Sequence, residues 1–269
     1  MISQIGFGFV GSALNKSFSL KNKKVEIYDK YKNLGSINDI IDSKICFFCL
    51  PTPFVKSSGF DKSAIIENLD NLEGAGFKGL VVIKSTIEIG TTKNLSEKYS
   101  FDICHNPEFL TERTAFEDFH NQKHIVLGKT RDSDLFNSLT LLYKELYPDA
   151  KISVCTSDES EAMKLFCNNF YAAKVMIFNE FYFLCQKLNV DFENTVNLML
   201  QNNWINPMHT KVPGPDGQVG YGGNCFIKDT NALLEQMVRN DSFHKVFESV
   251  VKQRDILRSD NNNIIDLDK

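Results

Sequence analysis

Short apolar runs alternate with amphipathic stretches through roughly the first 150 residues, a pattern typical of βαβ units around a parallel sheet. The amphipathic stretches between the runs, such as residues 62–72 and 132–146, are predicted to be helices. The runs themselves predict strands at residues 3–5, 24–28, 45–50, 80–84, 102–104, 124–127 and 152–155. The expected fold class of this part is therefore α/β, with a Rossmann-like doubly wound parallel sheet.

The character of the chain changes after Cys155. Residues 156–159 have capping-box spacing, and a helical pattern without Pro or Gly follows from about residue 159 to 188. Its apolar content on several faces predicts burial against other helices or another subunit. Further helices are expected at 192–200, 228–239 and 243–258, with a loop rich in Gly and Pro at 204–223. The predicted organisation is a sheet domain at 1–156, an all-helical central domain at 157–258 and a polar tail at 259–269.

Composition excludes several classes of protein. The formal net charge is −4, so the chain has no electrostatic reason to bind nucleic acid or an anionic membrane. No segment has the uninterrupted apolar length of a membrane span. The seven scattered cysteines suit free thiols in a reducing cytoplasm. Cys46 and Cys49 have CxxC spacing but lie in a strand-like run, so core packing is expected there and no metal site is predicted.

A glycine-rich run, Gly6-Phe7-Gly8-Phe9-Val10-Gly11, joins the first predicted strand to a helix, and Asp29 ends the second strand. In this context Gly6 permits a tight turn, Gly8 lets a pyrophosphate approach the backbone, and Gly11 lets the helix pack on the strand. Asp29 would accept hydrogen bonds from ribose hydroxyls and repel a 2′-phosphate, which favours NAD over NADP. The alternative is a glycine-rich turn with an ordinary capping Asp. Cofactor contacts are predicted for Gly6, Gly8, Phe9, Val10, Gly11 and Asp29.

Two threonines lie at the ends of later strands. Thr52 follows the third strand in Leu50-Pro51-Thr52-Pro53, and Thr86 follows the next one in Lys84-Ser85-Thr86. Open α/β sheets bind ligands at these strand ends, so each hydroxyl could contact a cofactor or a water. Taken singly, each threonine is more often a helix cap or a turn residue.

Two pairs of polar residues have a spacing of four. Glu108 and Glu112 follow the fifth strand and would share a face on a helical turn, although solvated surface acids are the usual explanation. Lys164 and Asn168 lie among apolar residues of the long helix. A buried ammonium there would have a lowered pKa and could polarise an oxygen or transfer a proton. The alternative is a lysine whose ammonium reaches the surface.

The segment around Cys225 is the richest in candidate chemistry. Gly222 and Gly223 bring the backbone in closely, and Cys225 falls at a predicted helix N-terminus, where a thiolate is stabilised. Asp229 lies one turn later on the same face, and Lys228 beside it can contact phosphate or cofactor. A buried structural cysteine is the commonest alternative, and the flanking residues make it less attractive.

Together these motifs resemble the UDP-glucose/GDP-mannose dehydrogenase family, over residues 2 to about 236. The resemblance implies a two-step oxidation of a sugar C6 alcohol to a carboxylate with two NAD⁺, through a thiohemiacetal and a thioester on the nucleophile Cys225. It also implies roles for other residues at matching motif positions. Asp229 and Thr86 would hold or activate a water, Lys164 and Asn168 would stabilise an oxyanion, and Glu108 would be the general base. The resemblance places Glu112 near the nicotinamide and Lys228 near the cofactor or the substrate. Substrate contacts are expected for Glu108, Phe109, Leu110, Lys164, Asn168, Tyr221, Gly222 and Cys225, and Thr52 and Thr86 are kept as cofactor contacts.

The resemblance also carries expectations about partners. The long helix is the family's dimer interface, so a homodimer is expected. Members usually continue into a second Rossmann-like domain that binds the nucleotide, and a separate chain or another subunit could supply it here. The substrate is expected to be a nucleotide sugar, with UDP-glucose first because residues 212–229 look most like that branch; UDP-N-acetylhexosamines and GDP-mannose stay open. Ile227 stands where the family usually has Pro.

Two other interpretations compete with this one. A sheet domain followed by a long helix with Lys164 and Asn168 also resembles the β-hydroxyacid dehydrogenases, which transfer one hydride and need no cysteine. A catalytically inactive paralogue that binds NAD is the second rival. Cys225 and its glycines favour the four-electron reaction over the first rival. Against the second, every catalytic position is filled, which a decaying copy would not be expected to maintain.

Overall fold

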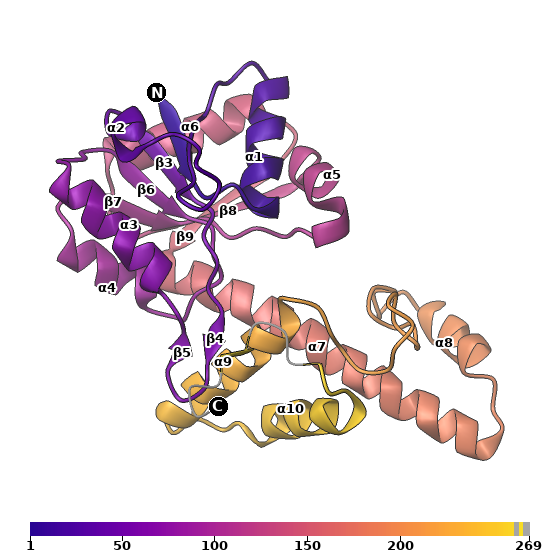
Figure 1. Ribbon diagram of the computed structural model, residues 1–269. Helices are drawn as coiled ribbons and strands as arrows, with labels where there is room; N and C mark the ends of the chain where they lie inside the picture. Colours follow the sequence, from indigo (N-terminus) through magenta and orange to yellow (C-terminus); the bar gives the residue numbers. More distant parts are fainter. Residues whose placement is uncertain (261–263, 266–269) are drawn as a thin grey trace. The chain divides into compact units, whose positions relative to one another are not determined.

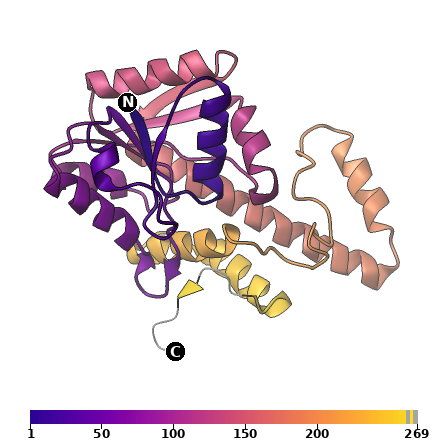
Figure 2. The ribbon, with the colours of Figure 1, turned by 45° about the horizontal axis from the view of Figure 1, so that its top comes forward.

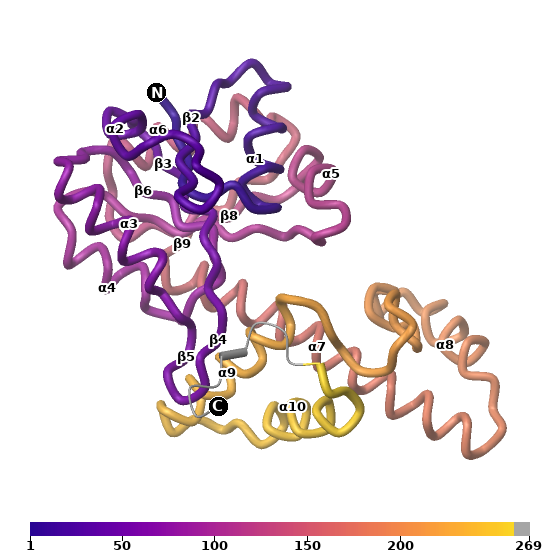
Figure 3. Tube along the Cα trace, in the orientation of Figure 1, coloured from indigo at the N-terminus to yellow at the C-terminus, as the bar shows by residue number. Residues whose placement is uncertain are grey.

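The computed structural model describes residues 1–260 and 264–265. The chain divides into two compact units, one of residues 1–52 and 61–164, the other of residues 53–60 and 165–269. Figure 3 follows the path of the chain through both. Within the described residues, no helix is both long and apolar enough to cross a bilayer.

The first unit is built on a seven-stranded sheet with the order β2-β1-β3-β6-β7-β8-β9 (Figure 1). Every strand that the apolar runs predict is present. The sheet is mostly parallel, as predicted; β7 and β8 are the exception and pair antiparallel. The strands are β1 (Ile2–Ile5), β2 (Glu26–Tyr28), β3 (Ile45–Phe48), β6 (Leu80–Ile83), β7 (Asp102–His105), β8 (His124–Lys129) and β9 (Lys151–Thr156).

The antiparallel pair follows from the connection that precedes β8. Residues 106–123 hold only a three-residue 3-10 helix and the six-residue α5, in place of a full crossover helix. The apolar content of a strand does not encode its direction, so the pattern alone could not reveal this reversal. The helices of this unit are α1 (Phe9–Leu20), α2 (Ile37–Ile40), α3 (Ser63–Gly74), α4 (Thr91–Lys98), η1 (Glu112–Thr114), α5 (Ala115–His120) and α6 (Asp134–Leu146).

Both faces of the sheet are covered by helices (Figures 1 and 2). Successive side chains of a strand point to opposite faces, and β3 shows this directly. Ile45 and Phe47 pack in a core with side chains of α1, α5 and α6. Cys46 and Phe48 pack on the other face with side chains of α3 and α4. Strands buried on both sides explain why the runs read as continuously apolar rather than alternating.

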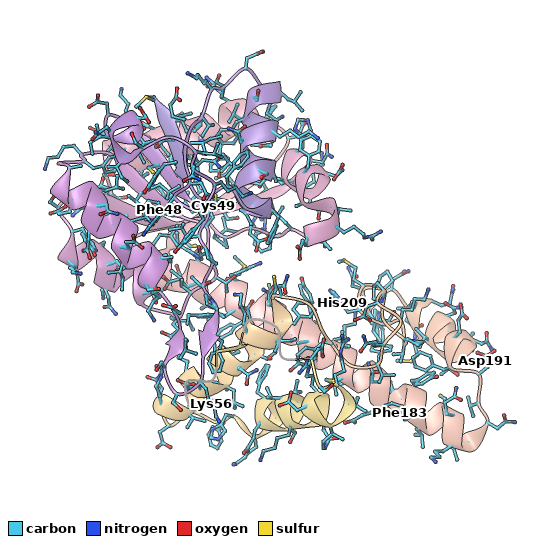
Figure 4. All side chains as sticks on the ribbon, in the orientation of Figure 1. Phe48, Cys49, Lys56, Phe183, Asp191 and His209 are labelled. Atoms are coloured by element: carbon cyan, nitrogen blue, oxygen red, sulfur yellow. The ribbon has the colours of Figure 1, made fainter. Side chains whose placement is uncertain are left out.

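The long helix α7 (Ser157–Leu188) begins directly after β9. Its first eight residues group with the sheet unit, and the remainder groups with the second unit. The second unit also contains α8 (Phe192–Leu200), α9 (Phe226–Arg239) and α10 (Lys245–Leu257). Asp191, labelled in Figure 4, begins α8 by accepting a hydrogen bond from the backbone N–H of Asn194 at 2.9 Å. Each of these helices was predicted, with ends that differ by up to two residues.

The second unit also contains a small sheet that the sequence did not predict. Its order is β10-β4-β5, from β4 (Phe54–Val55), β5 (Gly59–Phe60) and β10 (Ile264–Ile265). The central region is therefore helical with an added three-stranded sheet. Most of the predicted polar tail, 259–269, lies outside the described residues, apart from 259–260 and the backbone of β10.

Candidate functional site

Gly6 and Gly11 occupy positions in the first unit that only glycine fits. A Cβ on Gly6, whose φ is +91°, would lie 2.4 Å from the carbonyl oxygen of Cys49, which directly follows β3 and is labelled in Figure 4. A Cβ on Gly11 would lie 2.2 Å from the Gly6 carbonyl oxygen. By contrast, a Cβ on Gly8 would meet nothing within 4 Å. The fold therefore requires Gly6 and Gly11, whereas the space at Gly8 is open to a ligand.

A buried glutamine ties the glycine-rich turn together. Gln4 donates from Nε2 to the carbonyl oxygens of Gly6, at 3.0 Å, and Gly11, at 3.1 Å. Gln4 was not among the predicted site residues, although a Gln inside an apolar strand is unusual and was a signal for it. Its amide fixes the two ends of the turn to β1.

Asp29 lies beside the same turn. Its Oδ2 accepts a hydrogen bond from the Phe7 backbone N–H at 2.7 Å, and its Oδ1 accepts from the backbone N–H groups of Tyr31 and Lys32 at 3.0 Å. The Lys32 ammonium donates to the Phe7 carbonyl oxygen at 2.6 Å. The carboxylate predicted for ribose recognition is thus held rigidly next to the glycines. Carboxylate oxygens have further lone pairs with which to accept hydroxyl groups.

The two candidate threonines lie where the ends of β3 and β6 meet. Thr52 donates from its hydroxyl to the Thr86 carbonyl oxygen at 2.7 Å, and both residues are buried. A second bond of the same kind runs from the Ser85 hydroxyl to the Leu50 carbonyl oxygen at 2.6 Å. The Thr52 proton is therefore committed to the backbone, so this hydroxyl can meet a ligand only as an acceptor.

Lys84 is a buried cation that was not among the predicted site residues. Its ammonium donates to the side-chain and backbone oxygens of Asn106 at 2.9 and 3.0 Å, and burial lowers its pKa to about 8. Asn106 also accepts from the Tyr143 hydroxyl and donates to the Val126 carbonyl oxygen. This network fixes the end of β7, immediately before Glu108.

Glu108 and Lys164 form a buried ion pair in the first unit. Their Oε1 and Nζ atoms are 3.2 Å apart, and Nζ also donates to the Glu108 carbonyl oxygen at 2.6 Å. The side chains are 10% and 5% exposed, so Lys164 does not reach for the surface. Of the two interpretations of Lys164, the structure therefore supports the buried ammonium with a partner.

Glu108 and Glu112 do not lie on a common helical turn, so the shared face considered for them does not form. Residues 106–111 are irregular, because Asn106 is anchored to Lys84 and the Glu108 carboxylate accepts the Leu110 backbone N–H at 2.6 Å. Helical structure begins only at Glu112. Glu112 is exposed and lines a pocket of about 260 Å³ beside the first turns of α1, together with Phe9, Ser12, Ala13, Lys16, Arg113, Ala115, Phe116 and Glu117. Its position next to Phe9 is compatible with the predicted cofactor contact.

Glu161, which is remote from α4 in the sequence, caps the N-terminus of that helix. Its carboxylate accepts the backbone N–H groups of Gly90 and Thr92, each at 2.7 Å, and burial raises its pKa to about 7. Glu161 was not among the predicted site residues. A Glu three positions before Lys164, on so apolar a helix, was the signal that could have revealed it.

In the second unit, Cys225 is the N-cap residue of α9, as predicted. Its carbonyl oxygen accepts the Asp229 backbone N–H at 3.0 Å and so starts the first helical turn. The side chain is half-buried, unlike those of Cys46 and Cys104, which are closed in the sheet core. Cys225 thus lies where the N–H groups of a helix terminus are directed.

Asp229 lies fully buried one turn after Cys225 and is bound on both carboxylate oxygens. Asn168 donates from Nδ2 to Oδ2 at 2.7 Å, and the Lys228 ammonium lies 2.7 Å from Oδ1. The Lys228 ammonium also lies 4.6 Å from the centre of the Phe60 ring. Asp229 therefore orients Asn168 and Lys228, and a role on a water is still a prediction.

The remaining predicted residues divide between the units. In the first unit, Phe109 is exposed, its ring 5.4 Å from the Lys164 ammonium, and Leu110 packs at the edge of the core. In the second unit, Tyr221 is buried, and its hydroxyl lies 3.1 Å from that of Thr230 on α9. Gly222 packs against the guanidinium of Arg258. Thr86, Glu108 and Lys164 thus belong to one unit, while Asn168, Cys225 and Asp229 belong to the other.

Two parts of the chain match one protein family. Residues 32–147 match the NAD binding domain of the UDP-glucose/GDP-mannose dehydrogenase family, and residues 158–254 match its central domain. The chain belongs to the UDP-glucose/GDP-mannose dehydrogenase family. The resemblance stated from the motifs is thereby confirmed. The glycine-rich turn and Asp29 precede the matched residues, so they support the assignment independently.

The chain matches only part of the length of its relatives in this family. UDP-glucose 6-dehydrogenase YwqF of Bacillus subtilis is 33% identical over 183 residues, which are 64% of this chain and 39% of the relative. The chain spans about half the length of the curated relatives it matches first.

Solved structures show the same fold. A UDP-glucose dehydrogenase from the archaeon Pyrobaculum islandicum superposes with a TM-score of 0.83 at 22% identity, over 95% of this chain and 68% of that one. A 3-hydroxyisobutyrate dehydrogenase from Mycobacterium tuberculosis superposes with a TM-score of 0.77 at 15% identity, over 97% of this chain and 94% of that one. The fold is therefore common to both dehydrogenase classes and does not separate them.

The residues present fit the NAD that the family's first domain binds. The open space at Gly8 and the first turn of α1, which has no acidic residue, suit a pyrophosphate, and Asp29 suits an unphosphorylated ribose. Among the described residues, no group of three or more His, Cys, Asp or Glu side chains is placed to hold a metal ion.

Proposed function

We propose that this chain carries the cofactor site and the nucleophile of an NAD-dependent nucleotide-sugar 6-dehydrogenase. The preferred reaction is the four-electron oxidation of UDP-glucose to UDP-glucuronate. Cys225 at the N-cap of α9 is the observation on which the proposal rests, because it is half-buried, follows two glycines and is not enclosed in a core. A two-electron dehydrogenase of the same fold has no need of a thiol at this position.

The proposed chemistry balances with two oxidations and one hydrolysis. When bound, NAD⁺ accepts a hydride in each oxidation. The Cys225 sulfur adds to the carbonyl carbon of the C6 aldehyde, and the resulting thiohemiacetal is oxidised to a thioester. Water then attacks the thioester, the C–S bond breaks, and the carboxylate and the free thiol are released. The sum is one alcohol, two NAD⁺ and one water giving one carboxylate, two NADH and three protons.

Individual residues have proposed roles that follow from their chemistry. The Lys164 ammonium and the Asn168 amide are donors suited to an oxyanion. Glu108 is a carboxylate suited to accept a proton from the attacking water, and its ion pair with Lys164 fixes its direction. The N-terminus of α9 favours the thiolate form of Cys225, which is both nucleophile and leaving group. Asp229 holds Asn168 in place.

The stoichiometry of NADH tests the proposal directly. The purified chain is mixed with NAD⁺ and a panel of UDP-glucose, UDP-N-acetylhexosamines and GDP-mannose, alone and with candidate partner chains. Two NADH per sugar consumed are expected with one member of the panel. One NADH per sugar would instead support a β-hydroxyacid-type reaction, and NADH from none of them would support an inactive NAD-binding paralogue.

Replacement of the nucleophile gives a second test. Cys225→Ser keeps size and polarity but removes the thiolate, so uronate formation should stop after the aldehyde stage. Cys185→Ser is the matched control, because Cys185 is a half-buried thiol on α7 without a proposed role. Unchanged uronate production by Cys225→Ser would remove Cys225 from the mechanism.

We also propose that the chain forms a homodimer through α7. Within the second unit this helix exposes a series of large apolar side chains, which in an isolated chain would face water at a cost of about 25 cal/mol per Å². Several are about half exposed, including Phe170 at 64%, Leu184 at 57% and Leu188 at 64%. Together with Phe166, Ile177 and Phe181 they recur at intervals of three, four or seven residues, which follow one side of the helix.

A further inference from the structure

Two buried arginines lie at the end of α10. The side chains of Arg254 and Arg258 are 1% and 4% exposed. A guanidinium cannot lose its charge at ordinary pH, so it is buried only where carboxylates and carbonyl oxygens satisfy it. Both arginines donate to the carboxylate of Asp260: Arg254 Nη2 lies 2.5 Å from Oδ1, and Arg258 Nη2 lies 2.7 Å from Oδ2. The shared carboxylate locks the two guanidinium groups together.

The same arginines bind the segment that leads into Cys225, residues 216–223, here called the nucleophile loop. Arg254 donates from Nε to the Tyr221 carbonyl oxygen at 3.1 Å. Arg258 donates from Nη1 to Asp216 Oδ2 at 2.8 Å. The Arg258 guanidinium also lies so close to Gly222 that a Cβ there would be 2.3 Å from Nη2. Both arginines therefore contact the nucleophile loop, one through a carbonyl and one through a carboxylate and a glycine.

The nucleophile loop needs such support because of its composition. Gly220 and Gly223 have φ values of +72° and +78°, and glycines in these conformations leave the chain many alternatives when it is not held. On its C-terminal side Cys225 is fixed by the first turn of α9. On its N-terminal side the direction of the thiol depends on how the nucleophile loop approaches. The contacts of Arg254 and Arg258 act on this approach.

We propose that Arg254 and Arg258 are positioning residues for Cys225, which hold the nucleophile loop so that the thiol is presented at the N-terminus of α9. The inference deepens the proposed function and rests on it, because a nucleophile needs a fixed direction and a buried structural thiol does not. Arg258 and Asp260 lie beyond residue 254, where the match to the family's central domain ends. The family match therefore does not account for the whole of this network of Arg254, Arg258 and Asp260, here called the clamp.

Energetics favours a geometric role over simple stabilisation. Replacing a buried ion-pair network by apolar side chains of similar size is often neutral or stabilising, so such networks are a poor source of net stability. Their hydrogen bonds are directional and specify one arrangement. The clamp is therefore expected to affect the order of the nucleophile loop more than the stability of the second unit.

Thiol reactivity tests the proposal without any sugar substrate. The rate of Cys225 alkylation by iodoacetamide is measured from pH 5 to 10 by peptide mass spectrometry on the full chain, with Cys167 and Cys185 as internal references. In Arg258→Met the midpoint of the rate against pH should rise by about half a unit or more, because the released thiol leaves the helix terminus. Arg258→Lys should show a smaller rise, since a point charge cannot reproduce the planar fork.

Two further variants make the result decisive. Lys252→Met removes an exposed cation from α10, paired with Glu248, and should leave the Cys225 profile unchanged. Asp216→Asn removes only the outer carboxylate partner of Arg258. The Asp216 side chain is 44% exposed, so folding is not at risk. A small upward shift in the midpoint of the Cys225 alkylation rate against pH is expected. A Cys225 profile identical to wild type in Asp216→Asn and in folded Arg258→Lys would overturn the proposal, even if Arg258→Met failed to fold.

Activity gives a separate readout. If the panel of nucleotide sugars yields NADH with wild type, Arg258→Lys should lower kcat by about tenfold with little change in KM, because thiol placement matters to chemistry more than to binding. An equal loss through KM alone would contradict a positioning role. Absence of NADH with every sugar would refute the proposed function and leave the alkylation result as it stands.

Discussion

Two glycines of one turn should respond to alanine in opposite ways. Gly11 is enclosed, and its added Cβ would lie 2.2 Å from the Gly6 carbonyl oxygen and 2.8 Å from Gln4 Nε2. Gly8 is open, and its added Cβ would meet no protein atom within 4 Å. Gly11→Ala should therefore damage the fold, whereas Gly8→Ala should leave the fold intact and fill the space that a pyrophosphate would approach.

The magnitudes follow from these contacts. A carbonyl oxygen cannot stay 2.2 Å from a Cβ, since contacts below 3.0 Å essentially never occur, so in Gly11→Ala either the turn or α1 must move. Such overpacking costs about 1–3 kcal/mol. The displaced Gln4 amide would weaken two hydrogen bonds worth about 1 kcal/mol each. A total of about 3 kcal/mol lowers the Tm of a domain of this size by about 6–12 °C.

Gly8→Ala should change stability by less than about 1 kcal/mol, the scale of an N-cap substitution. Its affinity for NAD⁺ should fall by at least about tenfold, which is about 1.4 kcal/mol. Thermal denaturation followed by circular dichroism measures the first quantity, and isothermal titration with NAD⁺ measures the second. Wild-type NAD⁺ affinity in Gly8→Ala, or a wild-type Tm in Gly11→Ala, would refute the reasoning about this turn.

Three further predictions concern other parts of the chain. Burial raises the pKa of Glu161 to about 7 from an ordinary 4.5, so the folded chain holds this proton more tightly than the unfolded chain, and its contribution to stability falls as pH rises between those values. Glu161→Gln should remove this pH dependence of the free energy of unfolding. Denaturation at pH 5 and pH 8 measures the dependence, and an unchanged value in Glu161→Gln would contradict the prediction. Lys164→Met should destabilise by about 3 kcal/mol because it leaves the buried Glu108 carboxylate unpaired, and the double variant Lys164→Met/Glu108→Gln should recover most of the loss in urea denaturation; no recovery would contradict the pairing. Leu184→Glu should convert a dimer to a monomer in light scattering, and an unchanged mass would argue against α7 as the interface.

The sheet was predictable because its strands are buried on both faces. Apolar runs such as residues 45–50 and 80–84 are typical of strands in the interior of a parallel sheet. The glycine-rich turn identified the strand before it as the first strand of the fold. The direction of β8 was not predictable, since direction depends on the connection and not on the strand. The hairpin of β4 and β5 was missed because two-residue strands leave too short a pattern to detect.

Local sequence patterns indicated where several candidate residues lie in the secondary structure, but not which residues they contact. Cys225 could be placed at a helix terminus because glycines before it and a helical pattern after it are local signals. The Glu108–Lys164 pair joins residues 56 positions apart, and no local pattern encodes such a contact. The irregular path of residues 106–111 could not be predicted for the same reason, because distant side chains determine it.

The hairpin Pro53–Phe60 has a consequence for the order in which the chain can fold. Its strands pack against α9 and β10, whose residues are made about 170 and 200 positions later, so the hairpin cannot complete its contacts until residues 226–265 have emerged. Until then Phe54 and Phe60, which are 4% and 2% exposed in the finished structure, lack the surface that buries them. The N-terminal sheet can form early on the ribosome, while one of its own loops must wait for the last helices. A fragment cut after Thr156 would carry this unsatisfied hairpin permanently, and it should aggregate unless residues 53–60 are replaced by a short polar linker.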